Sequence, residues 1–140
     1  MRYAKTLAFS ALIPVLTACQ QTAPAPDAGA QMQLPQEMRG RWGLTANDCT
    51  ARHEALGDNK GLITIGPRTI TFYESRATLR SISERAPDRV DATFDVSGEG
   101  MEWTREMVLE VQDGGQMLIR RDLGADAQPG ALRYMACPAS

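Results

Sequence analysis

The clearest pattern in the chain is an alternation of apolar and polar residues near its middle. Every second residue from 90 to 96 is apolar and the residues between are polar, which is the period of a strand with one buried face. Residues 101–111 repeat the pattern, except that Arg105 interrupts the apolar side. Glycine-containing turns at 97–100 and 112–115 follow these segments and favour tight hairpins, because glycine accepts positive φ. The middle of the chain therefore predicts antiparallel neighbouring strands.

Shorter apolar segments separated by turn residues fill the rest of residues 38–140. Beside the two segments above, we predict strands over residues 41–45, 62–65, 69–74, 77–84, 117–122 and 132–137. Only residues 50–56 have a helix-like pattern. Eight strands joined mostly by hairpins predict an all-β domain, a small eight-stranded antiparallel up-and-down barrel, because closure removes exposed sheet edges. A two-sheet sandwich is the alternative.

The first 18 residues have the layout of a secretory signal peptide. Two basic residues precede an apolar run over residues 7–16, which two small residues follow. The run has about half of the roughly 20 residues that a membrane-spanning helix needs. We therefore expect it to be removed by cleavage.

The tetrad Leu16-Thr17-Ala18-Cys19 resembles the lipobox of bacterial lipoproteins. The resemblance implies that residues 1–18 are a cleaved lipoprotein signal peptide. It also implies that Cys19 receives a diacylglyceryl group and becomes the acylated N-terminus, with palmitate among its fatty chains. Several acyl chains make such anchoring effectively permanent, since one chain alone binds only marginally. An ordinary signal peptide with a chance cysteine is the alternative.

The same resemblance gives an expected location. In lipoproteins of Gram-negative bacteria, an aspartate directly after the cysteine marks retention in the inner membrane, and this chain has Gln20 there. The expected location is therefore the periplasmic face of the outer membrane, with the inner membrane as the alternative.

Residues 19–37 predict a lipidated N-terminus followed by a flexible tether. Residues 20–36 are rich in alanine, proline and glutamine, carry one charge and show no helix or strand period. At up to about 3.1 Å per residue, such a segment reaches roughly 50 Å. This reach is enough to hold a domain of residues 38–140 clear of the lipid headgroups.

Two cysteines, Cys49 and Cys137, remain after Cys19 is lipidated. An even number of cysteines in an exported protein favours a disulfide, which here joins the loop after the first strand to the end of the last strand. Two free redox-active thiols are the alternative, although the chain lacks the CxxC spacing of such sites.

Charge and composition exclude several classes of function. The chain has 15 Lys+Arg, 17 Asp+Glu and one histidine. Without a basic cluster it does not fit a nucleic-acid binder, and a single histidine excludes multi-histidine metal sites. We find no phosphate loop, metal-ligand spacing or nucleophile motif, so we expect no metal, no cofactor and no enzymatic activity.

Gly40-Arg41-Trp42 is similar to the GxW signature of lipocalin-like barrels. In those barrels the tryptophan closes the floor and an arginine from a late strand packs over it, a role that Arg121 or Arg133 could take here. A small family of bacterial inhibitors of secreted metalloproteases also looks similar, with about a hundred residues and a GxW start. This chain departs from that family in its tethered N-terminus and in the position of its second cysteine.

Two groups of residues are candidates for binding. Tyr73, Glu74 and Arg76 offer an aromatic ring, an acid and a cation at a strand end, where rigid scaffolds carry recognition loops; ordinary turn polarity is the alternative. Arg105 on an inward face must be paired, stacked or bound to an anion. It either lines a pocket for an acidic ligand, or is satisfied by an internal aspartate, or is turned outward by a β-bulge.

Together these patterns predict a lipid-anchored envelope lipoprotein. We expect its periplasmic barrel to bind a protein or another envelope component without catalysis. Inhibition of an exported hydrolase, such as a protease or a lysozyme, is the first alternative, and transport of a small ligand is the second.

Overall fold

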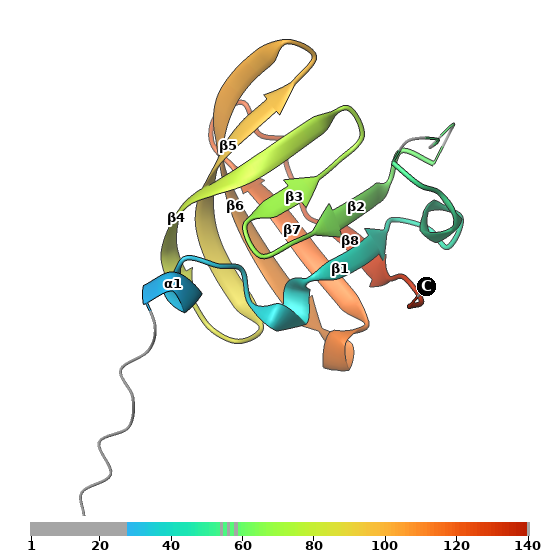
Figure 1. The fold of residues 1–140 in the computed structure, drawn as a ribbon, viewed down its shortest axis with the longest axis horizontal. Coiled ribbons are helices and arrows are strands. Elements are labelled where there is room, and N and C mark those ends of the chain that lie inside the picture. Colours follow the sequence, from blue (N-terminus) through green and yellow to red (C-terminus); the bar gives the residue numbers. More distant parts are fainter. Residues whose placement is uncertain (1–27, 54, 56, 58, 140) are drawn as a thin grey trace, which may run out of the picture.

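The computed structural model describes residues 28–53, 55, 57 and 59–139, which form one closed barrel of eight antiparallel strands (Figure 1). The strands follow one another around the barrel in chain order, and the first pairs with the last. They are β1 (Gly40–Gly43), β2 (Leu62–Ile65), β3 (Thr69–Thr71), β4 (Ser75–Arg85), β5 (Arg89–Gly98), β6 (Met101–Gln112), β7 (Met117–Leu123) and β8 (Leu132–Ala136). The predicted up-and-down barrel is confirmed, and the sandwich is excluded.

Helical structure among the described residues is short. It comprises the α-helix α1 (Ala28–Gln31) and the 3₁₀ turns Gln36–Met38, Asp48–Thr50 and Asp113–Gly115. The helix expected over residues 50–56 does not form among its described residues: only Thr50 is helical, as the last residue of a 3₁₀ turn, and residues 54 and 56 lie outside the described part of the chain. No described helix has the length and apolar character needed to span a membrane.

Side chains from every strand fill the interior of the barrel. The alternation in β5 places every second residue from 90 to 96 inside the barrel, including Phe94, which is fully buried. Fully buried leucine, isoleucine and methionine side chains from the other strands pack around it. Because each such side chain contributes about 1.5–3 kcal/mol on burial, the interior is the main source of the stability of the fold.

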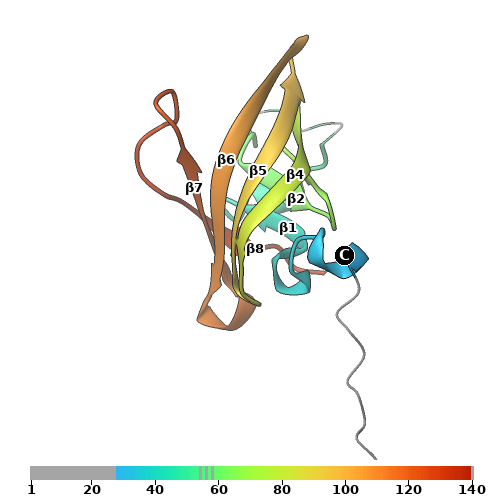
Figure 2. The ribbon, with the colours of Figure 1, turned by 90° about the vertical axis from the view of Figure 1, so that its left-hand side faces the viewer.

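The two ends of the barrel differ in what they carry. The connections β3–β4, β5–β6 and β7–β8 lie at one end, which we call the mouth. The connections β2–β3, β4–β5 and β6–β7 lie at the other end, which we call the base. Strands β4, β5 and β6 have 11, 10 and 12 residues, and β5 and β6 extend beyond the end of β7 at the mouth (Figure 2).

The segment before β1 closes the base. Leu34 and Met38 are fully buried in the core cluster. The backbone N–H of Leu34 donates to the carbonyl of Pro67 at 2.7 Å, and Nε1 of Trp42 donates to the carbonyl of Met38 at 2.8 Å. Leu34 belongs to the expected tether and Met38 is the first residue of the expected domain, so the packed part of the chain begins a few residues before the predicted boundary. The expected signal peptide, Cys19 and the expected tether up to residue 27 lie outside the described residues.

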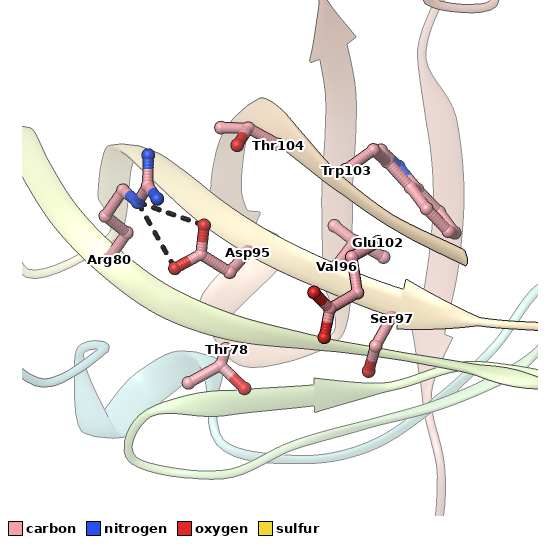
Figure 3. A pocket seen from close by; sticks show the side chains of 8 residues that line it. All are labelled: Thr78, Arg80, Asp95, Val96, Ser97, Glu102, Trp103 and Thr104. Atoms are coloured by element: carbon pink, nitrogen blue, oxygen red, sulfur yellow. Dashed lines mark hydrogen bonds and ion pairs between the residues drawn. The ribbon is translucent and has the colours of Figure 1, made fainter. Parts of the chain in front are cut away.

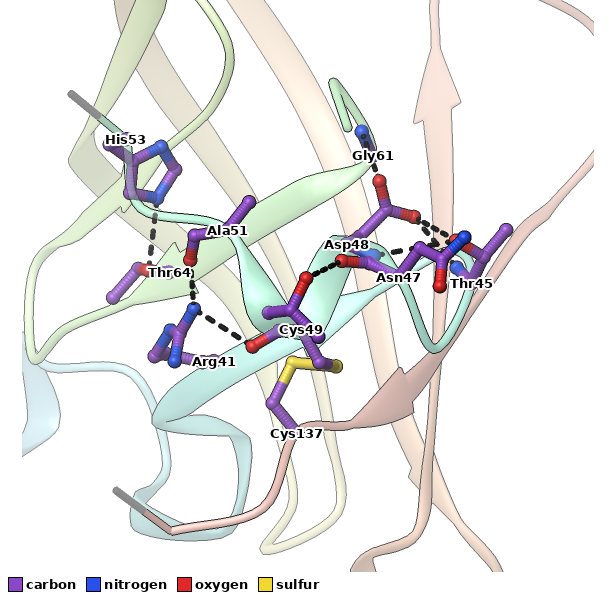
Figure 4. The surroundings of a disulfide bond; sticks show 11 residues. Arg41, Thr45, Asn47, Asp48, Cys49, Ala51, His53, Gly61, Thr64 and Cys137 are labelled. Carbon is purple, nitrogen blue, oxygen red and sulfur yellow. Dashed lines mark hydrogen bonds between the residues drawn. A yellow bond between two sulfur atoms is a disulfide. The ribbon is translucent and has the colours of Figure 1, made fainter. Parts of the chain in front are cut away.

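The first and last strands meet at a short seam. Two residue pairs join β1 to β8, whereas ten join β5 to β6. The predicted disulfide between Cys49 and Cys137 is confirmed, and it links chain positions 88 residues apart beside this seam (Figure 4). In the chain-entropy description, closing a loop of this length stabilises the fold by about 4.6 kcal/mol.

The loop between β1 and β2 folds back over the outer side of these strands. The carboxylate of the buried Asp48 accepts hydrogen bonds from the backbone N–H groups of Thr45 at 2.8 Å and Gly61 at 3.1 Å (Figure 4). A Cβ atom at Gly61 would lie 2.6 Å from an Asp48 carboxylate oxygen, so only glycine fits there. The Arg41 guanidinium donates to the carbonyls of Cys49 and Ala51, which holds the loop against β1.

Candidate functional site

The inner face of the barrel changes from apolar to charged at the mouth. The inward positions of β6 and β7 at this end hold Arg105, Arg120 and Asp122, whereas the same faces carry apolar residues deeper in the barrel. A pocket of about 270 Å³ opens here, lined by Phe72, Ser75, Val96, Trp103, Arg105, Met107, Arg120 and Asp122. The mouth pocket, defined by these residues, is the candidate binding site.

Arg120 is held in the mouth pocket by a fixed partner on its own strand. Its guanidinium donates to both carboxylate oxygens of Asp122 at 2.7 and 2.6 Å, and its Cζ lies 4.5 Å from the centre of the Phe72 ring. The Tyr134 hydroxyl accepts a further hydrogen bond at 3.5 Å. Burial lowers the pKa of Arg120, but the hydrogen bond to Asp122 and the neighbouring groups outweigh burial and leave the pKa raised. The guanidinium is therefore a permanent cation.

Burial also acts on the hydroxyl that Arg120 contacts. It raises the pKa of Tyr134 above its usual value, an effect that the nearby charge of Arg120 only partly offsets. Tyr134 is therefore neutral at physiological pH.

Arg105 has a partner of a different kind. Its side chain points inward at a position opposite Phe94, in a β5–β6 register without a bulge, and is 14% exposed. The guanidinium donates to both carboxylate oxygens of Asp126 at 3.2 and 3.1 Å, but the Asp126 side chain is 82% exposed. The aspartate partner that the sequence raised as one possibility is observed, although it is exposed and not internal, and the bulge is excluded.

The carboxylate of Asp126 is ionised under all ordinary conditions. A hydrogen bond from its own backbone N–H and the hydrogen bond and charge of Arg105 hold its pKa below the usual value. Asp126 belongs to the loop 124–131 that joins β7 to β8. The Arg105–Asp126 ion pair therefore ties a surface loop to the inner wall of the barrel.

Aromatic and apolar side chains form the rim of the mouth pocket. Trp103 is 37% exposed and Met101 is 60% exposed, although both share the inward face of β6 with buried residues. The strand pattern predicts their face correctly, but β7 ends at Leu123, opposite Glu106, so residues 101–105 of β6 have no partner on that side (Figure 2). An exposed tryptophan beside a cationic pocket is a typical anchor for a bound partner.

The three residues of the expected recognition tip lie around the mouth and not in the pocket. Tyr73 is half-buried against the cluster of Ala51 and Leu62, and Nζ of Lys60 lies 4.5 Å from its ring centre. Glu74 occupies the β3–β4 turn with φ of 57° and is exposed. Arg76 lies on β4, exposed and paired with Ser97 across the sheet. From the same stretch, Phe72 and Ser75 are the residues that line the mouth pocket.

Gly40 and Trp42 of the GxW pattern are at the base. Trp42 is buried beside Met38. Arg121 and Arg133 lie on the outer side of the barrel, because they alternate with the inward Leu118 and Tyr134 on their strands. Neither arginine therefore packs over Trp42 in the interior.

A second hollow, of about 480 Å³, lies on the outer face of β4, β5 and β6 (Figure 3). Thr78, Arg80, Asp95, Ser97, Glu102 and Thr104 point into it from the three strands. Nε of Arg80 lies 2.9 Å from a carboxylate oxygen of Asp95 in an ion pair (Figure 3), and both side chains are more than half exposed. Such exposed pairs contribute little to the free energy of unfolding. The Arg80–Asp95 pair is therefore a suitable control for the less exposed arginines of the mouth pocket.

The single histidine lies away from the mouth. Nε2 of His53 is 3.0 Å from the Thr64 hydroxyl on the outer side of β2 (Figure 4). Among the residues that the structure describes, no three or more His, Cys, Asp or Glu side chains are grouped so that they could hold a metal ion.

Four polar residues at the mouth were not singled out by the sequence: Arg120, Asp122, Asp126 and Tyr134. The sequence does contain a pattern that could have identified Arg120 and Asp122. They fall on the same side of the predicted strand 117–122 as Leu118, so they were polar residues at inward positions, as Arg105 was. No family model, curated protein or solved structure matches the chain.

Proposed function

We propose that this protein is a lipid-anchored envelope lipoprotein whose barrel binds a protein or another envelope component through its mouth, without catalysis. The observation that carries this proposal is the contrast between the two ends. The base is closed by buried apolar side chains of the N-terminal segment, whereas the mouth presents an exposed tryptophan and two inward arginines.

The direction of the chain supports a role for the mouth. The segment that leads toward Cys19 packs at the base, next to the β2–β3 turn. If Cys19 is lipidated, the chain to the anchor leaves the domain at the base, at the opposite end from the mouth. The site is then accessible to partners in the periplasm.

The chemistry of the mouth fits recognition. Arginine and tryptophan dominate the energetics of protein interfaces, because they combine a large contact area with directional donors. The alternative function, inhibition of an exported hydrolase, uses the same end of the molecule. It does not use the N-terminal segment around Leu34 and Met38, since those side chains are buried in the barrel.

Site-specific crosslinking in intact envelopes tests the proposal. A photoreactive amino acid replaces Met101 at the mouth or Gln36 at the base, both of which are exposed. We expect a discrete crosslinked product from position 101 and none from position 36. Products from position 36 alone, or from neither position, contradict the proposal. If the crosslinked partner is a hydrolase that loses activity on binding, the inhibitor alternative replaces the general binding function.

Anchoring is tested separately. Radiolabelled palmitate should appear on the wild-type protein and not on the Cys19→Ser variant. Absence of label from the wild type contradicts the lipoprotein assignment and leaves the crosslinking result to decide the role of the mouth.

A further inference from the structure

We propose that Asp126 occupies the place of a ligand's carboxylate, and that the mouth pocket binds alkyl or aryl carboxylates through Arg105 when Asp126 moves away. This inference rests on the proposed function and names the chemistry that the mouth recognises. The carboxylate comes from a free acid or from the C-terminal residue of a protein chain.

The first support is the unequal burial of the Arg105–Asp126 ion pair. The guanidinium belongs to a side chain that is 14% exposed, and its partner's side chain is 82% exposed. An arginine largely removed from water needs an anion, whereas an exposed aspartate is well solvated without a partner. Loss of the pair therefore costs more free energy at the poorly hydrated guanidinium of Arg105 than at the solvated carboxylate of Asp126. When the loop moves, Arg105 still requires an anionic partner.

The second support is the comparison with Arg120. Its partner Asp122 lies two residues away on the same strand and is 19% exposed, so this pair is fixed by β7. Asp126 lies in the loop 124–131, between Gly124 and Gly130, whose φ values of 118° and 101° require glycine. One inward arginine thus has a partner built into the sheet, and the other has a partner on a surface loop.

The third support is the surroundings of Arg105 in the mouth pocket. Phe72, Val96, Trp103 and Met107 provide apolar and aromatic walls beside the guanidinium. A volume of about 270 Å³ accommodates about nine groups the size of a water molecule, at about 30 Å³ each. A benzyl group or a short alkyl chain fits this space, with its carboxylate at the position that Asp126 occupies.

The test compares an acid with its amide in the full folded domain. The purified protein is titrated with 3-phenylpropionate, with 3-phenylpropanamide, and with an acetylated peptide that ends in a phenylalanine with a free carboxylate. Binding is followed by NMR on the Nε–Hε resonance of Arg105 and the backbone amides of residues 124–131. We expect the acid to bind at least about tenfold more tightly than the amide, because bidentate guanidinium–carboxylate bonds are charge-assisted.

Three variants separate the roles. Asp126→Asn should bind the acid about fivefold more tightly, because the internal competitor no longer occupies the site for most of the time. Arg105→Met should bind acid and amide equally. Asp95→Asn, which breaks the exposed Arg80–Asp95 pair on the outer face (Figure 3), should leave both affinities unchanged. Circular dichroism checks that each variant is folded.

The titrations can support or overturn the carboxylate site. Binding of the free acid and the peptide supports the shared chemistry, and binding of the peptide alone identifies a chain terminus as the source. Failure of both probes to shift the resonances at about 10 mM, far above the range of useful affinities, overturns the inference. Equal affinity of the wild type and Asp126→Asn overturns the role of Asp126. If these tests fail while position 101 still crosslinks to a partner, the proposed function stands and only the carboxylate chemistry is lost.

Discussion

The base and the mouth are the two ends of the same eight strands, yet the base is closed by apolar side chains and the mouth is lined by charged ones. At the base, Leu34 and Met38 enter the interior and exclude water. At the mouth, the inward positions change to arginine and aspartate, and β5 and β6 continue past the end of β7. The base therefore adds to the stability of the fold, whereas the mouth keeps charged groups that stability alone does not require.

This difference has a physical meaning. Partly buried ion pairs stabilise a fold little, because the loss of hydration offsets much of the charge attraction. Natural proteins break the rules of core packing chiefly at functional sites. Charges at the inward positions of one end, opposite an apolar seal at the other end, are the reason why we propose the mouth as the binding end.

Removal of the disulfide has the largest expected effect on the free energy of unfolding, because the disulfide lies beside the short β1–β8 seam that closes the barrel. The Cys49→Ala/Cys137→Ala variant should lose about 4–5 kcal/mol of unfolding free energy. Urea unfolding followed by tryptophan fluorescence measures this loss. A loss below about 1 kcal/mol would mean that the two β1–β8 residue pairs close the barrel without the disulfide.

A matched pair of leucine substitutions compares the two ends directly. Leu34 at the base is fully buried, and Leu132 near the mouth is 41% exposed. Leu34→Ala should lower the unfolding free energy by about 3 kcal/mol, and Leu132→Ala should lower it by about 0.5 kcal/mol. Equal losses in urea unfolding would contradict the view that the base is the stabilising end.

The Arg120–Asp122 pair tests whether the mouth charges reduce stability. Arg120→Met alone should lower the unfolding free energy by about 3 kcal/mol, because Asp122 is left without its cation. Arg120→Met/Asp122→Leu should recover at least about 1 kcal/mol of that loss, since no charge then remains. A double variant less stable than the single variant would show that the pair itself stabilises the barrel.

The smallest expected effect is on the acid titration of Asp126. Because its pKa is lowered in the folded state, the stabilising contribution of the Arg105–Asp126 pair is present above the carboxyl group's ordinary value near 3.8. It is lost as the pH falls through the lower, folded-state pKa. The carboxyl ¹³C resonance should therefore titrate below the usual range in the wild type.

The same titration of Arg105→Met supplies the control. The pKa of Asp126 should move only part of the way back to its ordinary value, because the hydrogen bond from its own backbone remains. An unchanged pKa in this variant would show that Arg105 does not act on Asp126 in solution.

Most of the fold follows from local pattern. The alternation over residues 90–96 predicts the inward face of β5, and the turns with glycine predict the hairpins that define the barrel. The sealed base does not follow from it, because Leu34 and Met38 stand in a stretch without periodicity. Their burial depends on the space left between strands that are distant in sequence.

The site is predictable only in part. Arg105 is visible in the sequence because it breaks a regular apolar face, and its partner in the structure is an aspartate, one of the three possibilities that the sequence left open. Which aspartate this is depends on the path of the loop 124–131, which local pattern does not determine. The exposure of Trp103 depends on β6 being longer than the neighbouring β7, and the predicted strands 101–111 and 117–122 already contain that difference.

Crosslinking from position 101 in intact envelopes, compared between the wild type, Arg105→Met and Arg80→Met, tests the central claim most directly. Each variant removes one arginine that pairs with an aspartate, Arg105 inside the mouth and Arg80 on the outer face. We predict that the partner crosslink is lost in Arg105→Met and retained in Arg80→Met, with both proteins folded. Equal yields from all three proteins would contradict the claim that the inward charge of the mouth recognises the partner.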